Sequence, residues 1–162
     1  MSDFNLASSY IYALTGDPNT VCDFRCIHDK DKGVPAHNFR GSLADTWATL
    51  CQYNNNGYGI FCTINAMDGN GRDNTNVHHI RTHVIDLDDA MTAQASYNLA
   101  VNFQPQPSFA VQTSPGKYHV YWLVEPYTGN DFYTQQQRKL AQVFNSDKKI
   151  IDAARVLRIP GF

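Results

Sequence analysis

The 162-residue chain is predicted to form one α+β domain, in which helices cover one face of a largely antiparallel sheet. Hydrophobic residues make up 43% of the chain, which is enough for a core and argues against disorder. Strand-like and helix-like segments follow one another in a mixed order, not as repeated βαβ units. A Ser-Pro-Gly-Lys sequence at 114–117 separates two apolar runs, a pattern typical of a β-hairpin.

The first third of the chain is predicted to be mostly helix and loop. Residues 4–14 suit a short helix that ends before Pro18, and residues 17–41 are rich in Asp, Lys, Pro and Gly, which favours a loop. Ser42 suits the N-cap of a second helix that ends at the Asn-rich residues 54–57.

The rest of the chain alternates strands and helices. In order, we expect a strand at 58–64, a polar loop at 65–77, a strand at 79–88, a helix at 91–102, hairpin strands at 108–113 and 118–124, a helix at 131–145 and a basic, apolar segment at 146–162. In the hairpin, pairing of Thr113 with Tyr118 would place His119 and Tyr121 on one face and Trp122 on the other.

Two carboxylates at the end of the predicted strand 79–88 are the most informative feature. Asp86 and Asp88 are separated by one residue, so they project from the same face of a strand. Anions this close repel each other unless a cation lies between them, and hard oxygen ligands suit Mg²⁺, which often also binds phosphates. The alternative is that Leu87-Asp88-Asp89 ends a strand and caps the next helix.

Further residues could complete a phosphate-handling site. Ser114 and Lys117 flank the hairpin turn next to His119, where a hydroxyl, an ammonium and an imidazole could hold a phosphate. Asp152 could be a third metal ligand, or it could pair with Arg155 three residues later. Asp147 is an alternative candidate both for the third metal ligand and for the carboxylate that pairs with Arg155, or it could cap a turn. Residues 117–162 carry seven basic and four acidic side chains, which would suit contact with phosphates.

Four motifs in this order resemble the signatures of the archaeo-eukaryotic primase superfamily. Val84-Ile85-Asp86-Leu87-Asp88 is similar to its first motif, Ser114 to His119 resembles the second, and Ile151-Asp152 resembles the third. Residues 155–162 are similar to the Arg-Leu-Pro-Gly signature of plasmid and phage primase-polymerases, and residues 54–72 resemble the preceding segment of RepB-type replication primases. The resemblance covers residues 40–162.

The resemblance implies a fold, a reaction and a set of residue roles. It implies a primase-polymerase catalytic domain over residues 1–162, in which an RRM-like sheet with helices and a second small α/β module surround a catalytic cleft. Two Mg²⁺ or Mn²⁺ ions would serve template-directed nucleotidyl transfer from NTP or dNTP on single-stranded DNA. The residues implied for these roles are Asp86, Asp88 and Asp152 for the metals, Ser114, Lys117, His119, Arg158 and Arg72 for the nucleotide, and Tyr121, Lys148, Lys149 and Arg155 for nucleic acid.

The sequence also predicts where the protein acts and with which partners, and it leaves two alternative functions open. No run of 18 apolar residues and no signal peptide are seen, so we expect no membrane partner and a cytoplasmic protein in a bacterial or archaeal host, encoded by a plasmid or phage. A helicase, fused or separate, is a possible partner, and the chain would be an excised or a minimal catalytic domain. The alternatives are a haloacid-dehalogenase-like phosphatase, whose motif should follow the first strand, and a non-catalytic module that binds single strands.

Overall fold

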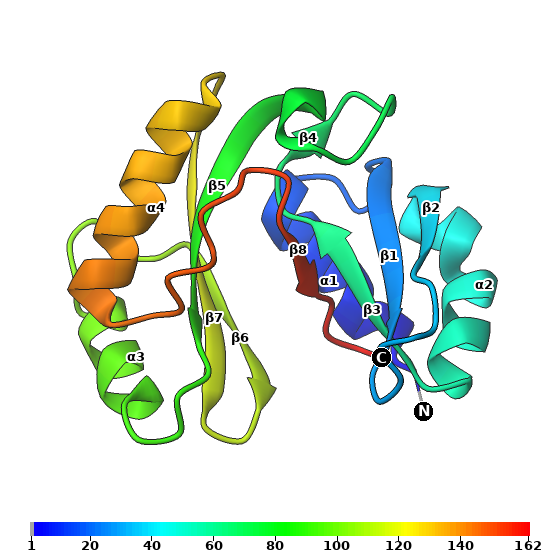
Figure 1. Cartoon of the computed structure of the whole chain (residues 1–162), viewed down its shortest axis with the longest axis horizontal. Helices are drawn as coiled ribbons and strands as arrows, with labels where there is room; N and C mark the ends of the chain where they lie inside the picture. Colours follow the sequence, from blue (N-terminus) through cyan, green and yellow to red (C-terminus); the bar gives the residue numbers. More distant parts are fainter. Residues whose placement is uncertain (1) are drawn as a thin grey trace.

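Two four-stranded antiparallel sheets stand side by side with helices packed around them, as Figure 1 shows for a computed structural model that describes residues 2–162. The first sheet has the order β2-β1-β3-β8 and the second has the order β4-β5-β7-β6. The α+β prediction is therefore confirmed. None of the helices within the described residues is long and apolar enough to cross a bilayer.

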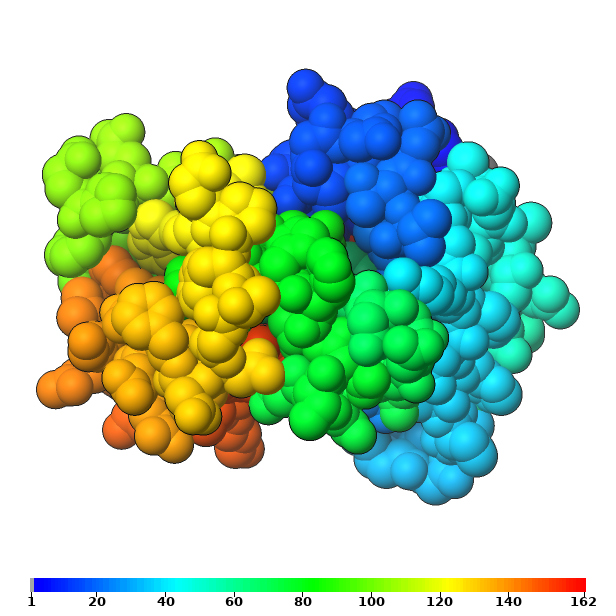
Figure 2. Space-filling view, turned by 90° about the horizontal axis from the view of Figure 1, so that it is seen from above, coloured from blue at the N-terminus to red at the C-terminus, as the bar shows by residue number. Residues whose placement is uncertain are grey.

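The first sheet and its helices form one half of the molecule. Its elements are α1 (Phe4–Thr15), β1 (Cys22–His28), β2 (His37–Gly41), α2 (Leu43–Asn55), β3 (Tyr58–Thr63) and the late strand β8 (Val156–Arg158). The second half contains β4 (Ala66–Met67), the 3-10 turn η1 (Asn74–Asn76), β5 (Val77–Leu87), α3 (Ala93–Val101), β6 (Phe109–Ser114), β7 (Lys117–Tyr127) and α4 (Asn130–Phe144). Figure 2 shows the two halves from above, with the chain of β5 in green between them.

The predicted loop at 17–41 is wrong, because it contains β1 and β2. Along β1, Cys22, Phe24 and Cys26 are buried, and the residues between them are more exposed. This alternation is that of a half-buried strand, but Asp23 and Arg25 on the open face gave the segment a loop-like composition. Asp23 and Arg25 line a cavity on this open face.

Helix α1 packs against both sheets. Its N-terminus is capped by the Asp3 carboxylate, which accepts a hydrogen bond from Leu6 N at 3.1 Å, and it ends at Gly16 in the left-handed conformation. Tyr10 and Ile11 belong to the same buried cluster as Val84 of β5 and many residues of the first sheet. The helix thus fixes the two halves against each other.

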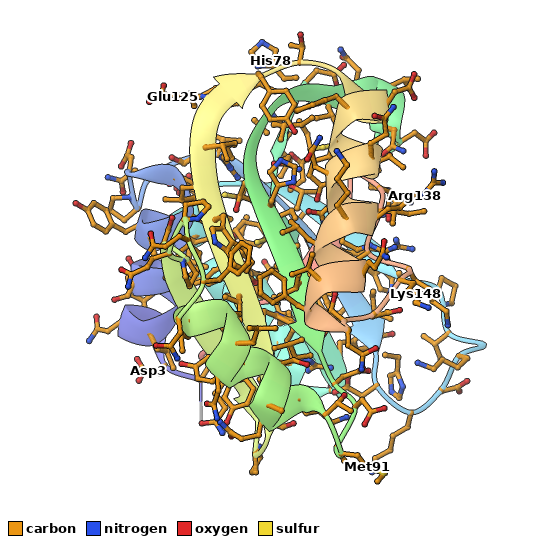
Figure 3. All side chains as sticks on the ribbon, turned by 90° about the vertical axis from the view of Figure 1, so that its left-hand side faces the viewer. Asp3, His78, Met91, Glu125, Arg138 and Lys148 are labelled. Carbon is orange, nitrogen blue, oxygen red and sulfur yellow. The ribbon has the colours of Figure 1, made fainter. Side chains whose placement is uncertain are left out.

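The inner and outer faces of the second sheet have different roles. Ile85 and Leu87 of β5 and Trp122 of β7 form a core with α3 and α4, which cover the outer face in Figure 3. Because neighbouring residues of a strand alternate in direction, Val84 and Asp86 point the other way, toward the first half of the molecule. The strand thus uses one face for packing and offers the other for chemistry.

The hairpin forms with a register different from the expected one. Ser114 pairs with Lys117 across a two-residue turn, and an irregularity between Gln112 and Ser114 brings Val111 opposite His119. The expected pairing of Thr113 with Tyr118 is wrong, because a bulge on β6 absorbs one residue. The faces of β7 are unaffected, and His119 and Tyr121 still lie on the inner face.

Residues 145–155, which we call the strap, return from the end of α4 to the first sheet. The buried amide of Gln137 anchors it: Nε2 donates to the Val84 carbonyl at 2.8 Å and to the Ile150 carbonyl at 3.0 Å. Asp147 N donates to the carbonyl of Asp86 at 3.1 Å. Gln137 of α4 and this backbone contact therefore hold the strap beside the end of β5.

Candidate active site

Asp86 and His119 form the centre of the site. They are direct partners across β5 and β7, and His119 Nε2 lies 3.5 Å from Asp86 Oδ1. The His119 side chain is only 7% exposed, whereas the Asp86 side chain keeps about a fifth of its surface exposed. A buried imidazole thus faces a carboxylate that solvent can reach.

Burial and neighbouring charges shift both groups toward their neutral forms. Burial, followed by the charges of Asp88 and Asp147, raises the pKa of Asp86 to about 6, although Lys117 and Arg155 oppose the shift. Burial, followed by the charge of Arg158, lowers the pKa of His119 to about 4. His119 is therefore neutral at pH 7, and its contact with Asp86 is a polar contact rather than an ion pair.

The third carboxylate beside the pair belongs to Asp147, not Asp152. Asp147 lines two cavities together with Asp86 and Asp88, and its charge contributes to the raised pKa of Asp86. Asp152 lines a different cavity, where its Oδ1 lies 2.5 Å from Arg155 Nη2. The expected grouping of Asp152 with the pair is not observed, because the strap turns away after its contact with Asp86.

The three carboxylates lie between two adjoining cavities. The first, which we call the carboxylate cavity, has a volume of about 570 Å³ and adds the residues Phe61, Ser114, His119, Arg155 and Arg158. The second, the lysine cavity, has a volume of about 490 Å³ and adds the residues Asp89, Thr92, Ser146, Lys148 and Lys149. The hydroxyl oxygens of Thr92 and Ser146 are buried without a hydrogen-bond partner among the described residues. A ligand with polar groups could satisfy them.

Arg158 is held over the carboxylate cavity by packing and charge. Its guanidinium carbon lies 4.9 Å from the centre of the Phe61 ring, and Nη2 lies 2.5 Å from Asp29 Oδ1. A Cβ atom on Gly59 would lie 2.6 Å from the same guanidinium, so only glycine leaves room for it there. Gly59 thus supports the position of Arg158, a role that no pattern in the sequence indicates.

The other predicted site residues fall into two groups. Ser114 lies in the carboxylate cavity, and Lys117 is close enough to affect the pKa of Asp86. Two expectations are wrong. Arg72 lies in a cavity without Asp86, Asp88 or Asp147, on the loop after β4, and so is not in the nucleotide site expected from sequence. Tyr121 has no exposed surface, so its ring cannot stack on a base.

Tyr121 instead supports His119 from below. Its hydroxyl lies 3.3 Å from His119 Nδ1 and 3.2 Å from the hydroxyl of Tyr10 in α1. A neutral imidazole with its proton on Nε2, toward Asp86, can accept from the Tyr121 hydroxyl at Nδ1. The chain of polar contacts thus fixes the orientation of the ring from inside the core.

The donor set suits a divalent metal ion. Carboxylate oxygens are the ligands that Mg²⁺ and Mn²⁺ prefer, and a cation would offset the burial and the charges of Asp88 and Asp147 that raise the pKa of Asp86. Among residues 2–162, no three His, Cys, Asp or Glu side chains already stand at coordinating distance from one point. The carboxylates would therefore draw together around an ion.

A family model decides what this arrangement belongs to. The model of the RepB DNA-primase N-terminal domain matches residues 64–162, which is more than half of the chain. The chain belongs to this family. It therefore contains a DNA primase domain, of the nucleotidyltransferase type. Asp86 of this primase lies on the fifth strand, which contradicts the phosphatase alternative, whose motif should follow the first strand.

Solved structures of primases share the fold. The AEP domain of the primase-polymerase of cyanophage S-2L is 20% identical, with a TM-score of 0.79 over 99% of this chain and 83% of that one. The primase RepB′ is 16% identical, with a TM-score of 0.74 over 98% of this chain and 50% of that one. The catalytic domain of RepB′ in complex with initiator DNA is 20% identical, with a TM-score of 0.67 over 99% and 78%. None of the curated proteins matches the sequence.

Proposed function

We propose that this primase chain catalyses template-directed nucleotidyl transfer on single-stranded DNA, dependent on Mg²⁺ or Mn²⁺, in plasmid or phage replication. The reaction joins a 3′-oxygen to the α-phosphorus of an NTP or dNTP and releases pyrophosphate. The observation that supports it most is the position of Asp86, Asp88 and Asp147 between two adjoining cavities. Two reactants could meet there at one set of carboxylates.

The two cavities differ in a way that suits the two reactants. The carboxylate cavity offers His119, Ser114 and Arg158 to the triphosphate, and Arg158 is already oriented by Phe61 and Asp29. The lysine cavity offers Lys148 and Lys149 to the strand or nucleotide that carries the attacking 3′-hydroxyl. Positioning of both reactants at a fixed cluster of charge is the main contribution that a protein makes to phosphoryl transfer.

Each group of the chain then has a defined task. Asp86, Asp88 and Asp147 would hold the metal ions. When bound, the ions neutralise phosphate charge and lower the pKa of the attacking hydroxyl. Neutral His119 would donate a hydrogen bond from Nε2 to the triphosphate without adding a buried charge. Arg158 would supply the positive charge near the phosphates.

The test is nucleotide incorporation on a defined single strand. The protein is incubated with an unstructured oligonucleotide, labelled dNTPs or NTPs and Mn²⁺, with Asp88→Asn and Asp147→Asn as active-site variants and Asp152→Asn as the matched control. We expect wild type and Asp152→Asn to form products, and both active-site variants to lose at least about a hundredfold in rate. Products of unchanged amount in Asp88→Asn and Asp147→Asn would refute the proposal. DNA binding by wild type without any product would favour the non-catalytic alternative.

A further inference from the structure

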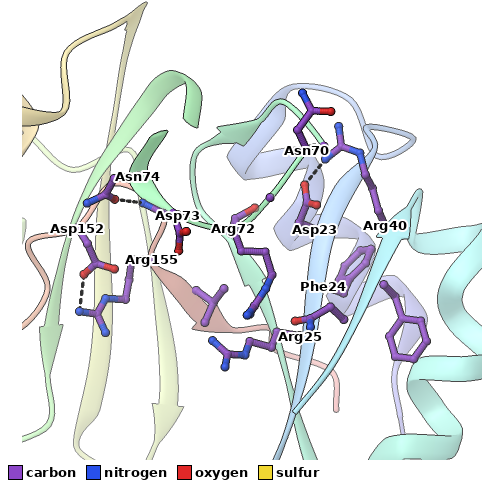
Figure 4. Close-up of a pocket in the computed structure, with 17 residues that line it drawn as sticks. Asp23, Phe24, Arg25, Arg40, Asn70, Arg72, Asp73, Asn74, Asp152 and Arg155 are labelled. Atoms are coloured by element: carbon purple, nitrogen blue, oxygen red, sulfur yellow. Dashed lines mark hydrogen bonds and ion pairs between the residues drawn. The ribbon is translucent and has the colours of Figure 1, made fainter. Parts of the chain in front are cut away.

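A third cavity is lined by four arginines and three aspartates, Asp23, Asp73 and Asp152. It has a volume of about 490 Å³ and lies between the open face of the first sheet, the loop after β4 and the strap (Figure 4). Its guanidinium groups belong to Arg25, Arg40, Arg72 and Arg155. We call it the arginine cavity. Neither Asp86, Asp88 nor Asp147 lines it.

Two of these arginines have no counter-charge. Arg40 pairs with Asp23, and Arg155 pairs with Asp152, whereas among residues 2–162 neither Arg25 nor Arg72 forms an ion pair. The Nε atom of Arg25 is also buried without a hydrogen-bond partner. Burial, followed by the charge of Arg72, lowers the pKa of Arg25, so the two cations are close enough to repel each other. Such a pair is stabilised by an anion that contacts both.

The loop that carries Arg72 is fixed in place. Gly69 has a φ of +86°, and a Cβ atom there would lie 2.9 Å from Nε of Arg40, so the loop passes directly over that side chain. Asn74 Oδ1 accepts a hydrogen bond from Ala154 N at 3.0 Å, which ties the loop to the strap. Figure 4 shows Arg72 extending from this loop toward Arg25. The two guanidinium groups are thus preorganised, which lowers the cost of binding an anion.

The cavity is continuous with the carboxylate cavity along one row of the first sheet. Arg25 is opposite Phe61 across β1 and β3, and Phe61 is opposite Arg158 across β3 and β8. Adjacent strands are about 4.8 Å apart, so the row places Arg25 and Arg158 about 10 Å apart with an aromatic ring between them. Phe61 is partly exposed and also lines the carboxylate cavity. Cations that flank an aromatic ring on an open sheet are the pattern of a single-strand binding surface.

We infer that the arginine cavity binds a backbone phosphate of the single-stranded DNA template through Arg25 and Arg72, and that Phe61, whose ring carries the Arg158 guanidinium, lies between this phosphate and the active site. This inference rests on the proposed function, because it assumes that a template reaches the carboxylate cavity. The incoming nucleotide is the less suitable occupant, since its phosphates must lie at the metal ligands, which are absent from this cavity. A polymer with repeated phosphates can occupy both ends of the row.

Binding measurements on the whole chain test this inference. The variants are Arg25→Gln and Arg72→Gln, with Arg138→Gln as a control that removes an equal charge from the exposed face of α4 (Figure 3). The probe is a fluorescein-labelled oligo-dT strand, followed by anisotropy over a series of KCl concentrations. We expect each cavity variant to weaken binding about five- to tenfold at low salt and to reduce the slope of log affinity against log salt by about 0.7. Arg138→Gln should stay within about twofold of wild type.

A second titration separates the template from the nucleotide. Binding of a fluorescent dNTP with Mn²⁺ should remain within about twofold of wild type in Arg25→Gln and Arg72→Gln. Loss of nucleotide binding with unchanged DNA binding would assign the cavity to the triphosphate and overturn the inference. Unchanged DNA affinity and salt slope in both variants would overturn it as well. If Arg25→Gln fails to fold, Arg72→Gln decides alone, because Arg72 is an exposed loop side chain.

The failure of this inference differs from the failure of the proposed function. A chain that binds oligo-dT through Arg25 and Arg72 but incorporates no nucleotide would leave the template surface standing and refute the enzymatic proposal. Nucleotide incorporation of unchanged efficiency in both arginine variants would refute the template surface and leave the enzymatic proposal standing. Arg25→Lys keeps the positive charge but lacks the several N–H donors of the guanidinium. Compared with Arg25→Gln, it should recover most of the salt slope and only part of the affinity for oligo-dT.

Discussion

Replacement of Asp86 by Asn should stabilise the metal-free protein at neutral pH. The carboxylate has a pKa of about 6 in the folded chain against a usual value of 3.8, chiefly because it is buried and faces Asp88 and Asp147. A pKa difference of about 2 units corresponds to about 3 kcal/mol of unfavourable free energy in the ionised folded form. Asn has the same shape without the charge, so about 3 kcal/mol is the upper limit of the gain.

The pH dependence of the effect follows from the direction of the shift. Because the folded pKa lies above the unfolded one, the folded state holds the proton more tightly, and the wild type loses stability as pH rises from about 4 to about 6. Above this window the carboxylate is ionised in both states, and the whole penalty is present. The advantage of Asp86→Asn should therefore be near zero at pH 4, about half its final size at pH 5 and complete at pH 7.

Equilibrium unfolding in urea with EDTA, at pH 5 and pH 7.5, measures this difference. Asp131→Asn in the first turn of α4 is the matched control, which removes an exposed carboxylate and should show no gain at either pH. Addition of Mn²⁺ should reverse the order at pH 7.5, because the ion stabilises wild type more than the variant. A variant that is less stable than wild type without metal, or an advantage that does not shrink at pH 5, would refute the reasoning.

Three further outcomes follow from the structure. Asp147→Asn should weaken Mn²⁺ binding at least about tenfold by calorimetry, and Asp152→Asn should change it less than about twofold; the opposite order would restore the third ligand expected from sequence. Gly161→Ala should destabilise the fold by about 2–3 kcal/mol in urea titrations, because a Cβ atom there would meet backbone oxygen at 2.5 Å at a φ of +95°. Gly116→Ala, at a φ of +75° in open space, should cost only about 1 kcal/mol, and equal losses would contradict the packing argument. Tyr121→Phe should leave oligo-dT affinity unchanged by anisotropy and lower stability by about 1 kcal/mol, whereas a large loss of DNA affinity would mean that the buried hydroxyl has a direct role.

The pattern of β5 made the centre of the site predictable from sequence. An apolar strand that carries Asp86 next to its end identifies the inner face by alternation, and His119 follows from the same rule on β7, whereas Asp88 lies just beyond the last residue of β5. Such local patterns survive in the structure because strand geometry fixes the direction of each side chain. The hairpin register did not survive, since a bulge is a matter of one residue that alternation does not reveal.

The third carboxylate could not be chosen from sequence, because its position depends on a distant contact. Asp147 and Asp152 both follow α4 within a few residues, and both suit a metal. Gln137 decides between them by binding the carbonyls of Val84 and Ile150, which places the start of the strap beside β5. The resemblance to known motifs pointed to Asp152, which in the structure lines the arginine cavity and pairs with Arg155.

The arginine cavity was hidden by a different limit. Arg25 lies in a segment whose charges predicted a loop, and without β1 there was no reason to place it near Arg72, which is 47 positions later in the chain. The two meet only because β1 pairs with β3 and the loop after β4 folds back over the sheet. A charge on the open face of a strand thus looks like a loop residue until its neighbours are known.

The hydrogen bonds of Gln137 have a consequence for the choice of ion. Its amide Nε2 bridges β5 and the strap, so this core side chain, together with the backbone hydrogen bond from Asp147 to Asp86, sets the spacing of these two proposed ligands. Ionic radius is what distinguishes Mg²⁺ from Mn²⁺ and Ca²⁺ at otherwise similar oxygen ligands. If the carboxylates hold an ion as proposed, its selectivity would be adjustable from the hydrophobic interior, by packing changes around α4 that alter neither Asp86 nor Asp147.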